Sequence, residues 1–333
     1  MPGAESSDLA GRLRELAADA LGDAATQIDE LRRLTGGASR ETWSFDAVTP
    51  NGERRALILR RDLGGEPATG RGFATEVQAL RAAQQAGVPE PNVLATSDDP
   101  SILGAPFVLM ERVEGETLAP RILRDDALAD VRPRLAEQCG EILARIHAIP
   151  VDSVPDLHHP DPVESLRRDL AEFDEPSPPF ELGLRRLEAT RPPASEPALV
   201  HGDFRNGNLI VGPDGIRAVL DWELVQIGDP MQDLGHLCAR VWRFGGPGPV
   251  GGFGEYEDLF CGYERVSGLR VDPAALRWWQ LRATLWWGIG CMQMAWRHLS
   301  GTTRSVELAA IGRRAWEQEY DVMLLLAGEL QAA

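Results

Sequence analysis

The sequence contains no lysine: all 34 basic side chains among its 333 residues are arginine. The guanidinium group is planar and always charged, so any site that is usually built around a lysine must be built differently here. Basic residues are also outnumbered by 51 acidic ones, which leaves a formal net charge of −17. Because a chain of this charge repels phosphate backbones, we expect no nucleic-acid partner.

Cysteines and long apolar runs are scarce as well. The cysteines form no Cys-x-x-Cys pair, so we expect small core residues in a reducing compartment: Cys139, Cys238, Cys261 and Cys291. The N-terminus lacks the basic start and apolar run of a signal peptide. The most apolar segment, 275–299, is interrupted by Arg277, Arg282 and Arg297, which argues against a bilayer span. We therefore expect a cytoplasmic protein with no membrane partner.

Two short apolar runs, 209–211 and 216–220, flank the turn sequence Gly-Pro-Asp-Gly. This arrangement predicts a β-hairpin. Folding the hairpin brings its open ends together, so we expect Asn208 and Asp221 to lie side by side. Their amide and carboxylate oxygens are hard ligands that suit Mg²⁺ holding a triphosphate. Asp203, on the loop that enters the hairpin, is placed to accept a proton from a substrate hydroxyl. The alternative is an ordinary hairpin beside a buried histidine and two capping aspartates.

The pattern His201-Gly202-Asp203-x-x-x-x-Asn208, followed by Asp221, resembles the catalytic loop and metal aspartate of the aminoglycoside phosphotransferase family. The resemblance implies an α+β, bilobal, protein-kinase-like fold. Its small β-rich N-terminal lobe would cover residues 1–112, and its larger, mostly helical C-terminal lobe 113–333. It also implies transfer of the γ-phosphoryl group of ATP or GTP to a small-molecule hydroxyl.

The same resemblance assigns roles to the loop residues. Asp203 is the base, Asn208 and Asp221 hold Mg²⁺, and His201 fixes the loop. Arg205 occupies the place of the kinase catalytic-loop lysine and neutralises charge on the transferring group. In the segment that starts the next helix, 228–234, Asp233 is expected to accept hydrogen bonds from the loop backbone.

The N-terminal third is expected to bind the nucleotide. Apolar spacing predicts a helix at 8–21, and strands follow from Ile28. Residues 34–45 are predicted to form two strands around a glycine-containing turn. By resemblance, the residues of this turn and its second strand cover the phosphates: Gly36, Gly37, Ser39 and Thr42.

Further nucleotide contacts are expected from the next elements. The predicted strand 56–60 ends on Arg60, in the position of the phosphate-gripping lysine of kinases. A helix predicted at 73–86 carries Glu76 as the ion-pair partner of Arg60. At the end of the predicted strand 107–111, backbone groups near Glu111 and Val113 are expected to bind the adenine.

The C-terminal half is predicted to be helical, with helices at 129–148, 274–299 and 306–327 and two short helices within the proline-rich stretch 151–197. His147 is expected to be a capping or packing residue, and the pair His158-His159 a solvated loop. The tryptophans of 274–299 are expected in the core, with an aromatic wall facing a substrate as the alternative.

The sequence leaves the identity of the phosphate acceptor open. A hydroxyacyl-CoA would need arginines and an apolar groove, for which Arg167, Arg168, Arg185 and Arg186 are available. An aminoglycoside or choline-like amino alcohol would need carboxylates, which 161–175 contains. Similarity to the kinase-like part of acyl-CoA dehydrogenase fusions, through Leu59-Arg60 and Asp-Trp-Glu at 221–223, favours the first. Rivals are a non-catalytic nucleotide-binding module, given Arg60, and a protein kinase, which the short segment after Asp221 disfavours. The oligomeric state is not predicted.

Overall fold

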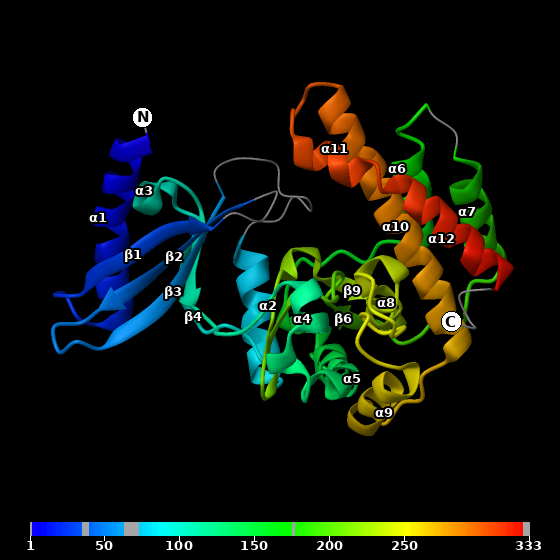
Figure 1. The fold of residues 1–333 in the computed structure, drawn as a ribbon, viewed down its shortest axis with the longest axis horizontal. Helices are drawn as coiled ribbons and strands as arrows, with labels where there is room; N and C mark the ends of the chain where they lie inside the picture. Colours follow the sequence, from blue (N-terminus) through cyan, green and yellow to red (C-terminus); the bar gives the residue numbers. More distant parts are fainter. Residues whose placement is uncertain (1, 35–39, 63–72, 175–176, 329–333) are drawn as a thin grey trace.

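The computed structural model describes residues 2–34, 40–62, 73–174 and 177–328, with side chains described from Leu9 onward. It confirms an α+β chain with a small sheet-containing lobe and a larger helical lobe (Figure 1). In the first lobe a five-stranded antiparallel sheet has the order β1-β2-β3-β5-β4. Its strands are β1 Gln27–Leu34, β2 Glu41–Val48, β3 Arg54–Arg61, β4 Val93–Ser97 and β5 Phe107–Glu111.

Alternating side chains give this sheet two apolar faces. Leu57 and Leu59 of β3 pack with Leu9 and Leu13 of helix α1 (Pro2–Leu21) on one face. Ile58, between them, packs on the other face with Phe73 and Val77 of α2 (Phe73–Gln85). Because neighbouring residues of a strand point to opposite faces, a continuous apolar strand can be covered on both sides.

Helix α2 belongs to the cores of both lobes. Its first turn packs on the sheet, whereas Ala79, Leu80 and Ala83 pack with the main core of the helical lobe. The connection after β5 also contacts that lobe, because Glu116 exchanges backbone hydrogen bonds of 2.9 and 3.0 Å with Val211. These contacts hold the sheet against the helical lobe. The division at residues 112 and 113 stays a prediction.

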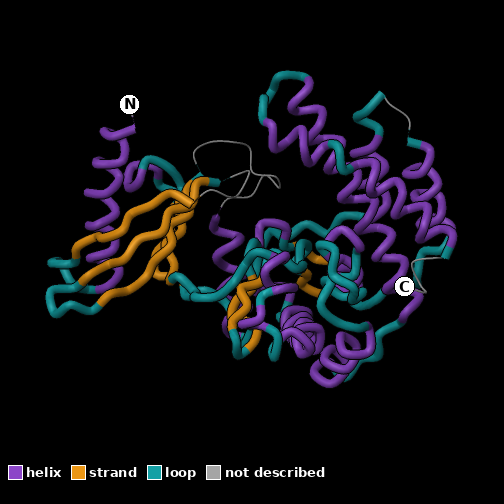
Figure 2. The backbone as a smooth tube through the Cα atoms, viewed as in Figure 1, coloured by secondary structure: helices purple, strands orange, loops and turns teal. Residues whose placement is uncertain are grey.

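The helical lobe contains two small two-stranded antiparallel sheets among its helices (Figure 2). Strand β6 (Ala198–Val200) pairs with β9 (Gln226–Gly228), and β7 (Leu209–Gly212) pairs with β8 (Gly215–Val219). The helices are α4 Ala119–Arg124, α5 Leu135–His147, α6 Pro162–Leu170, α7 Pro178–Ala189, α8 Met231–Leu237, α9 Tyr256–Ser267, α10 Pro273–Leu299, α11 Val306–Gly312 and α12 Ala315–Ala327, with α3 Pro100–Leu103 in the first lobe. Short 3-10 turns are η1 Asp126–Leu128, η2 Arg132–Arg134, η3 Val151–Ser153, η4 Trp222–Leu224 and η5 Arg240–Arg243.

Several predicted elements are corrected at their ends. The helix expected at 129–148 begins only at Leu135, because Pro133 lies in the separate turn η2 and lacks an N–H for an intrahelical bond. The helix expected at 306–327 is two helices. The first ends at Gly312, where it crosses α10 so closely that an added Cβ would lie 2.6 Å from the Cβ of Ala295. The predicted helix at 8–21 is confirmed and starts earlier, at Pro2.

The cysteines are unpaired, and three of them are buried as expected: Cys139, Cys238 and Cys291. Cys261 was predicted to be a core residue and is exposed, because it lies on the outward face of α9. None of the helices in the described part of the chain is long and apolar enough to cross a membrane. His158 and His159 lie exposed in a loop, as predicted.

Candidate active site

The loop from 201 to 208 connects β6 to the hairpin β7–β8. Leu209 faces Val219 across the hairpin, and the N–H of Leu220 donates to the carbonyl of Asn208 at 2.8 Å. The open end of the hairpin therefore brings Asn208 next to the residue that precedes Asp221. The predicted hairpin and the juxtaposition of its ends are confirmed.

Asp203 is buried at 8% exposure, and three side chains contact its carboxylate. Arg205 Nε and His236 Nε2 lie 3.0 and 2.9 Å from Oδ1, and Asn208 Nδ2 donates to Oδ2 at 2.7 Å. Burial alone raises the pKa of Asp203, but the charge of Arg205 and the hydrogen bond from His236 outweigh it and lower the pKa to about 2. The carboxylate is thus ionised near neutral pH and can only accept hydrogen bonds.

Asp233 holds the backbone of the loop, as the resemblance implied. Its fully buried carboxylate accepts the N–H groups of His201 and Gly202 at 2.8 and 2.9 Å. His147 Nε2 lies 3.2 Å from the same carboxylate and His147 Nδ1 lies 3.1 Å from the hydroxyl of Tyr263. His147 is therefore a packing residue that supports the loop through Asp233.

Gly202 has no room for a side chain. Its φ is +85°, and an added Cβ would lie 2.4 Å from the carbonyl oxygen of Leu224. Next to it, the ring of His201 accepts the N–H of Asp203 at 3.2 Å through Nδ1, and its Nε2 lies 3.1 Å from the carbonyl of Leu220. Burial lowers the pKa of His201. Both ring nitrogens are engaged with the backbone, so His201 shapes the loop.

The two expected metal ligands offer oxygen atoms at the end of the hairpin. Asn208 uses Nδ2 to contact Asp203, and its Oδ1 has no hydrogen bond to any described residue. Asp221 has a left-handed backbone, with φ of 70°, and its side chain is 34% exposed. No group of three or more His, Cys, Asp or Glu side chains suits a metal within the described ranges. One amide and one carboxylate fit Mg²⁺, which keeps water and phosphate oxygens as its other ligands.

Glu76 forms the predicted ion pair with Arg60 and a second one with Arg40. Arg60 also reaches across the lobes, with Nη2 3.4 Å from Oδ1 of Asp221. Burial would lower the pKa of Arg60, but Glu76 and Asp221 raise it. Sequence reasoning missed Arg40, whose only signal was its position directly after the glycine-containing turn.

The other predicted nucleotide contacts have different outcomes. Gly36, Gly37 and Ser39 lie outside the described residues. Thr42 lies opposite Arg60 across the β2–β3 pair. The N–H of Glu111 already donates to the carbonyl of Asn92 at 2.9 Å, which leaves only its carbonyl for adenine. The N–H of Val113 has no backbone partner in the part of the chain that the structure describes.

A cluster of aromatic rings lies beside Asp203. His236 packs against Trp242 and Trp286, with ring centroids 5.5 Å away in both cases. The guanidinium of Arg205 stands 4.5 Å over Trp242, which contacts Trp287 at 4.9 Å. Sequence reasoning missed His236. The available signal was its position three residues after Asp233, which places both side chains on one face of α8.

Some tryptophans of α10 lie in the core, and others are partly exposed. Trp278 and Trp279 are buried in a core with α6 and α7, which confirms the core interpretation for them. Trp286 and Trp287 are partly exposed and belong to the aromatic cluster around His236. Trp296 is 55% exposed.

Asn206, left without a role by the sequence, anchors the loop to a glycine-rich segment. Its Nδ2 donates to the carbonyl of Gly251 at 2.8 Å. The segment 245–254 contains six glycines and two prolines, and its composition was the signal for a close backbone approach. An added Cβ at Gly252 would lie 2.2 Å from the carbonyl oxygen of Arg243.

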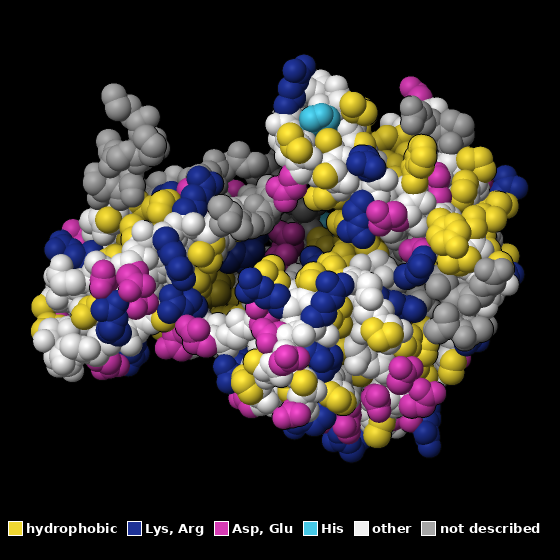
Figure 3. Space-filling model, in the orientation of Figure 1, with side chains coloured by type: hydrophobic (Ala, Val, Ile, Leu, Met, Phe, Trp, Pro, Cys, Tyr) yellow, Lys and Arg dark blue, Asp and Glu magenta, His cyan; other side chains and the backbone are white. Residues whose placement is uncertain are grey.

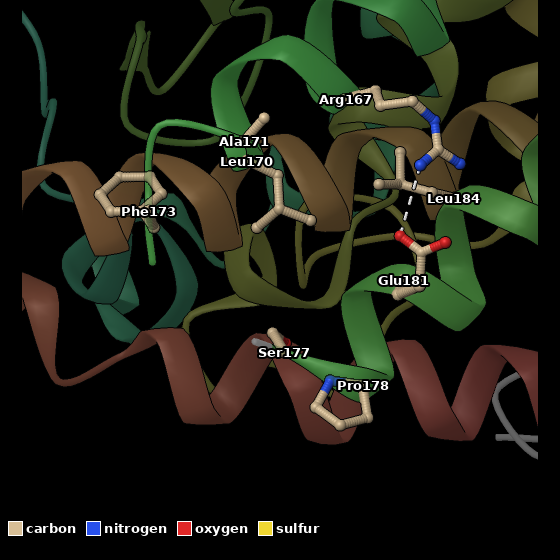
Figure 4. A pocket seen from close by; sticks show the side chains of 8 residues that line it. All are labelled: Arg167, Leu170, Ala171, Phe173, Ser177, Pro178, Glu181 and Leu184. Carbon is tan, nitrogen blue, oxygen red and sulfur yellow. Dashed lines mark hydrogen bonds and ion pairs between the residues drawn. The ribbon is translucent and has the colours of Figure 1, made fainter. Parts of the chain in front are cut away.

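Three of the four arginines expected for a hydroxyacyl-CoA are paired with carboxylates: Arg167, Arg168 and Arg185. Arg186 is exposed and has no ion pair with any described residue. A pocket of about 460 Å³ lies between α6 and α7. Figure 4 shows its lining side chains, with Arg167 pointing toward Glu181. Arg167 contacts Glu181 at 3.4 Å and Glu188 at 2.8 Å, and Arg185 also contacts Glu181. This pocket shares no lining residue with the contacts of Asp203. A separate recess lies between the two lobes, and acidic and basic side chains line it (Figure 3).

Comparison with known proteins gives concordant matches. Residues 30–269 match the model of the phosphotransferase enzyme family. Acyl-CoA dehydrogenase family member 10 of Mus musculus is 29% identical over 236 residues, 67% of this chain and 21% of the relative. Family member 11 of Gallus gallus is 33% identical over 177 residues, 48% of this chain and 22% of the relative. The chain thus spans about a fifth of the length of these relatives.

Solved structures show the same fold. A Ralstonia eutropha protein provisionally assigned as an aminoglycoside phosphotransferase superposes with a TM-score of 0.72 at 22% identity, covering 95% of this chain and 97% of the other. A choline/ethanolamine kinase family protein of Mesorhizobium loti gives 0.65 at 19% identity, covering 97% and 95%. A thermostable mutant of the aminoglycoside phosphotransferase APH(4)-Ia, bound to AMP-PNP and hygromycin B, gives 0.62 at 17%, covering 95% and 97%. The protein-kinase-like fold is confirmed.

Proposed function

Because the chain belongs to the phosphotransferase enzyme family, we propose that it transfers the γ-phosphoryl group of ATP, or of GTP, to the hydroxyl of a small molecule. The observation that carries this proposal is the environment of Asp203. Its carboxylate is ionised, nearly buried and oriented by Arg205, Asn208 and His236. A preorganised acceptor of this kind suits the orientation and deprotonation of an alcohol.

In the proposed reaction the acceptor oxygen forms a bond to the γ-phosphorus as the bond to the β,γ-bridging oxygen breaks. The hydroxyl proton passes to Asp203, and ADP leaves. Arg205 lies beside Asp203 and neutralises charge on the transferring group. Arg60, oriented by Glu76, binds the α- and β-phosphates. Asn208 Oδ1 and the Asp221 carboxylate would hold Mg²⁺, which would supply charge neutralisation on the phosphates.

The proposed acceptor is a hydroxyacyl-CoA. The relatives named as acyl-CoA dehydrogenases support this choice. The partly exposed rings of Trp286 and Trp287 also support it, because such rings suit an acyl chain. Three arginines of α6 and α7 do not add support, because Arg167, Arg168 and Arg185 are paired with carboxylates. The alternative is an aminoglycoside or choline-like amino alcohol, which the structural neighbours favour.

Two rivals make different predictions. A non-catalytic nucleotide-binding module would bind Mg·ATP without turnover on any acceptor, and Asp203→Asn would change nothing. A protein kinase would label proteins of an extract with phosphate from labelled ATP. Only η4 and β9 separate Asp221 from α8, a spacing without room for a kinase-length activation segment.

The test is Mg·ATP-dependent release of ADP with 4-hydroxyacyl-CoA thioesters, aminoglycosides, choline and a homoserine-like amino alcohol. Asp203→Asn is compared with Asp258→Asn, a matched control at an exposed position of α9. We expect turnover with one acceptor class, lost in the first variant and kept in the second. Nucleotide binding without turnover on any acceptor would contradict the proposal.

A further inference from the structure

A second cavity, of about 620 Å³, lies between the turn η5 and helix α12. Its lining includes the side chains Arg240, Arg243, Phe244, Arg314, Gln318 and Asp321. Three arginines and two carboxylates, Glu317 and Asp321, line the cavity, an excess of one positive charge in a chain whose net charge is −17.

Two of the three arginines are neutralised. Arg240 Nη1 lies 2.6 Å from Oδ1 of Asp321, and Arg314 Nε lies 3.0 Å from Oε2 of Glu317. The side chain of Arg243 has no ion pair or hydrogen bond with any described residue, although it is only 7% exposed. Its Nε and Nη2 atoms are buried without a partner. Since a guanidinium cannot lose its proton in a protein, the charge stays.

Gln318 gives a second, independent sign of a missing partner. It is 1% exposed, and neither its amide nitrogen nor its amide oxygen makes a hydrogen bond within the described ranges. Buried polar groups in proteins are nearly always hydrogen-bonded. An unpaired cation and an unpaired amide in the lining of one cavity therefore indicate a place for a polar ligand of negative charge.

The cavity adjoins the catalytic loop. Phe244, in its lining, has its ring Cζ 3.8 Å from the Cβ position of Gly207. Trp242, next to Arg243 in η5, lies under the guanidinium of Arg205. The same turn thus borders both the cavity and the group that contacts Asp203.

We propose that this cavity binds an anionic group, a carboxylate or a phosphate, carried by the phosphate acceptor, with Arg243 as its main ligand. The inference rests on the proposed function and adds a charged recognition site to it. Arg243 can donate two parallel hydrogen bonds to such a group, and Gln318 can donate a third. The same chemistry would also bind a free anion, and the experiments separate the two sources.

The first experiment measures binding of phenylphosphonate by calorimetry, with the nucleotide cleft saturated by Mg·ADP. We expect Arg243→Met to weaken binding roughly 10- to 100-fold, the loss typical of hydrogen bonds to a charged group. Arg277→Gln, at an exposed position of α10 outside the cavity, should leave binding unchanged. Arg243→Lys keeps the charge without the planar fork and should retain part of the affinity.

Thermal unfolding separates a ligand role from a structural one. Since Arg243 has no partner to lose, Arg243→Met should unfold at the same temperature as the parent or higher. A marked destabilisation, absence of phenylphosphonate binding by the parent, or equal binding by Arg243→Met would each overturn the site.

The second experiment uses the acceptor that supports turnover. If its anionic group occupies the cavity, Arg243→Met raises the KM for this acceptor roughly 10- to 100-fold and leaves the KM for ATP unchanged. A neutral ester of the acceptor should show no such difference between parent and variant. Unchanged acceptor KM with weakened phenylphosphonate binding would overturn the acceptor assignment in favour of a free anion. Phenylphosphonate binding at Arg243 without turnover on any acceptor would overturn the proposed function and not the site.

Discussion

His236 Nε2 lies 2.9 Å from Oδ1 of Asp203, although 33 residues separate them in the chain. The histidine is 1% exposed and enclosed by Trp242 and Trp286. Asp203 therefore has one carboxylate oxygen oriented from α8 and the other from Asn208. The orientation of the carboxylate therefore depends both on the catalytic loop, through Asn208, and on α8, through His236.

Replacing His236 should lower the turnover rate without affecting nucleotide binding. In His236→Leu the carboxylate loses one of its three side-chain partners, and we expect kcat to fall roughly 10- to 100-fold with the KM for ATP unchanged. His236→Gln keeps a donor of similar reach and should restore most of the rate. Steady-state kinetics of both variants test this, and equal losses in the two would show that the histidine only fills space.

Arg60 should not be replaceable by the lysine that kinases use at this place. A single ammonium cannot keep the contacts to both Glu76 and Asp221 that the guanidinium makes. We expect Arg60→Lys to weaken Mg·ATP binding roughly tenfold, about 1.4 kcal/mol. Arg54→Lys, on the exposed part of the same strand, is the control. Tighter nucleotide binding by Arg60→Lys, measured by calorimetry, would contradict this.

Asp233 should be needed for the stability of the loop. Each oxygen of Asp233 accepts one N–H, from His201 or from Gly202. In Asp233→Asn one of these oxygens is replaced by an NH₂ group, which is a donor and cannot accept the N–H that faces it. We expect a loss of roughly 1–3 kcal/mol in the free energy of unfolding, together with a loss of turnover. Urea denaturation measures the first effect. A variant as stable as the parent would show that other contacts hold the loop.

The buried carboxyl of Glu90 should lower the stability of the fold as the pH rises and the group ionises. Burial raises its pKa well above the usual value, although Trp222 donates a hydrogen bond to Oε1 at 3.1 Å. An acid whose folded pKa is raised binds its proton more tightly in the fold. Its favourable contribution is complete below its unfolded pKa and is lost as the pH rises through the folded pKa.

Glu90→Gln should therefore be more stable than the parent at neutral pH, and the difference should shrink as the pH is lowered toward 5. Urea denaturation at several pH values between 5 and 8 measures the two curves. A constant difference across this range would mean that Glu90 does not titrate there.

The sequence predicted the parts of the fold that depend on neighbouring residues. Apolar spacing was sufficient for α1, α2 and α10, and the turn composition for the hairpin β7–β8, because local geometry decides these elements. The errors lie at helix boundaries. Pro133 delayed the start of α5, and the crossing of α11 over α10 at Gly312 divided a helix that apolar periodicity alone continued.

In the candidate site, too, the sequence predicted the residues that lie close together in the chain and missed the partners that lie far away in it. Asp203, Asn208 and Asp221 are recognisable because one loop and one hairpin carry them, and the geometry of the hairpin brings its ends together. The partners that complete the site come from elsewhere: Arg40 meets Glu76 across 36 residues, and Gly251 meets Asn206 across 45. No local pattern specifies such contacts, because they arise only when helices and loops pack.

The sequence by itself thus determined the family, through a short motif whose chemistry depends on residue type and spacing. Only the tertiary structure decided which side chains orient Asp203 and which arginines keep a free charge. Arg167 and Arg185 looked available in the sequence but are neutralised by carboxylates, whereas Arg243 is buried without one. Whether a charge is paired depends on distances across the fold, and those distances exist only once the chain is packed.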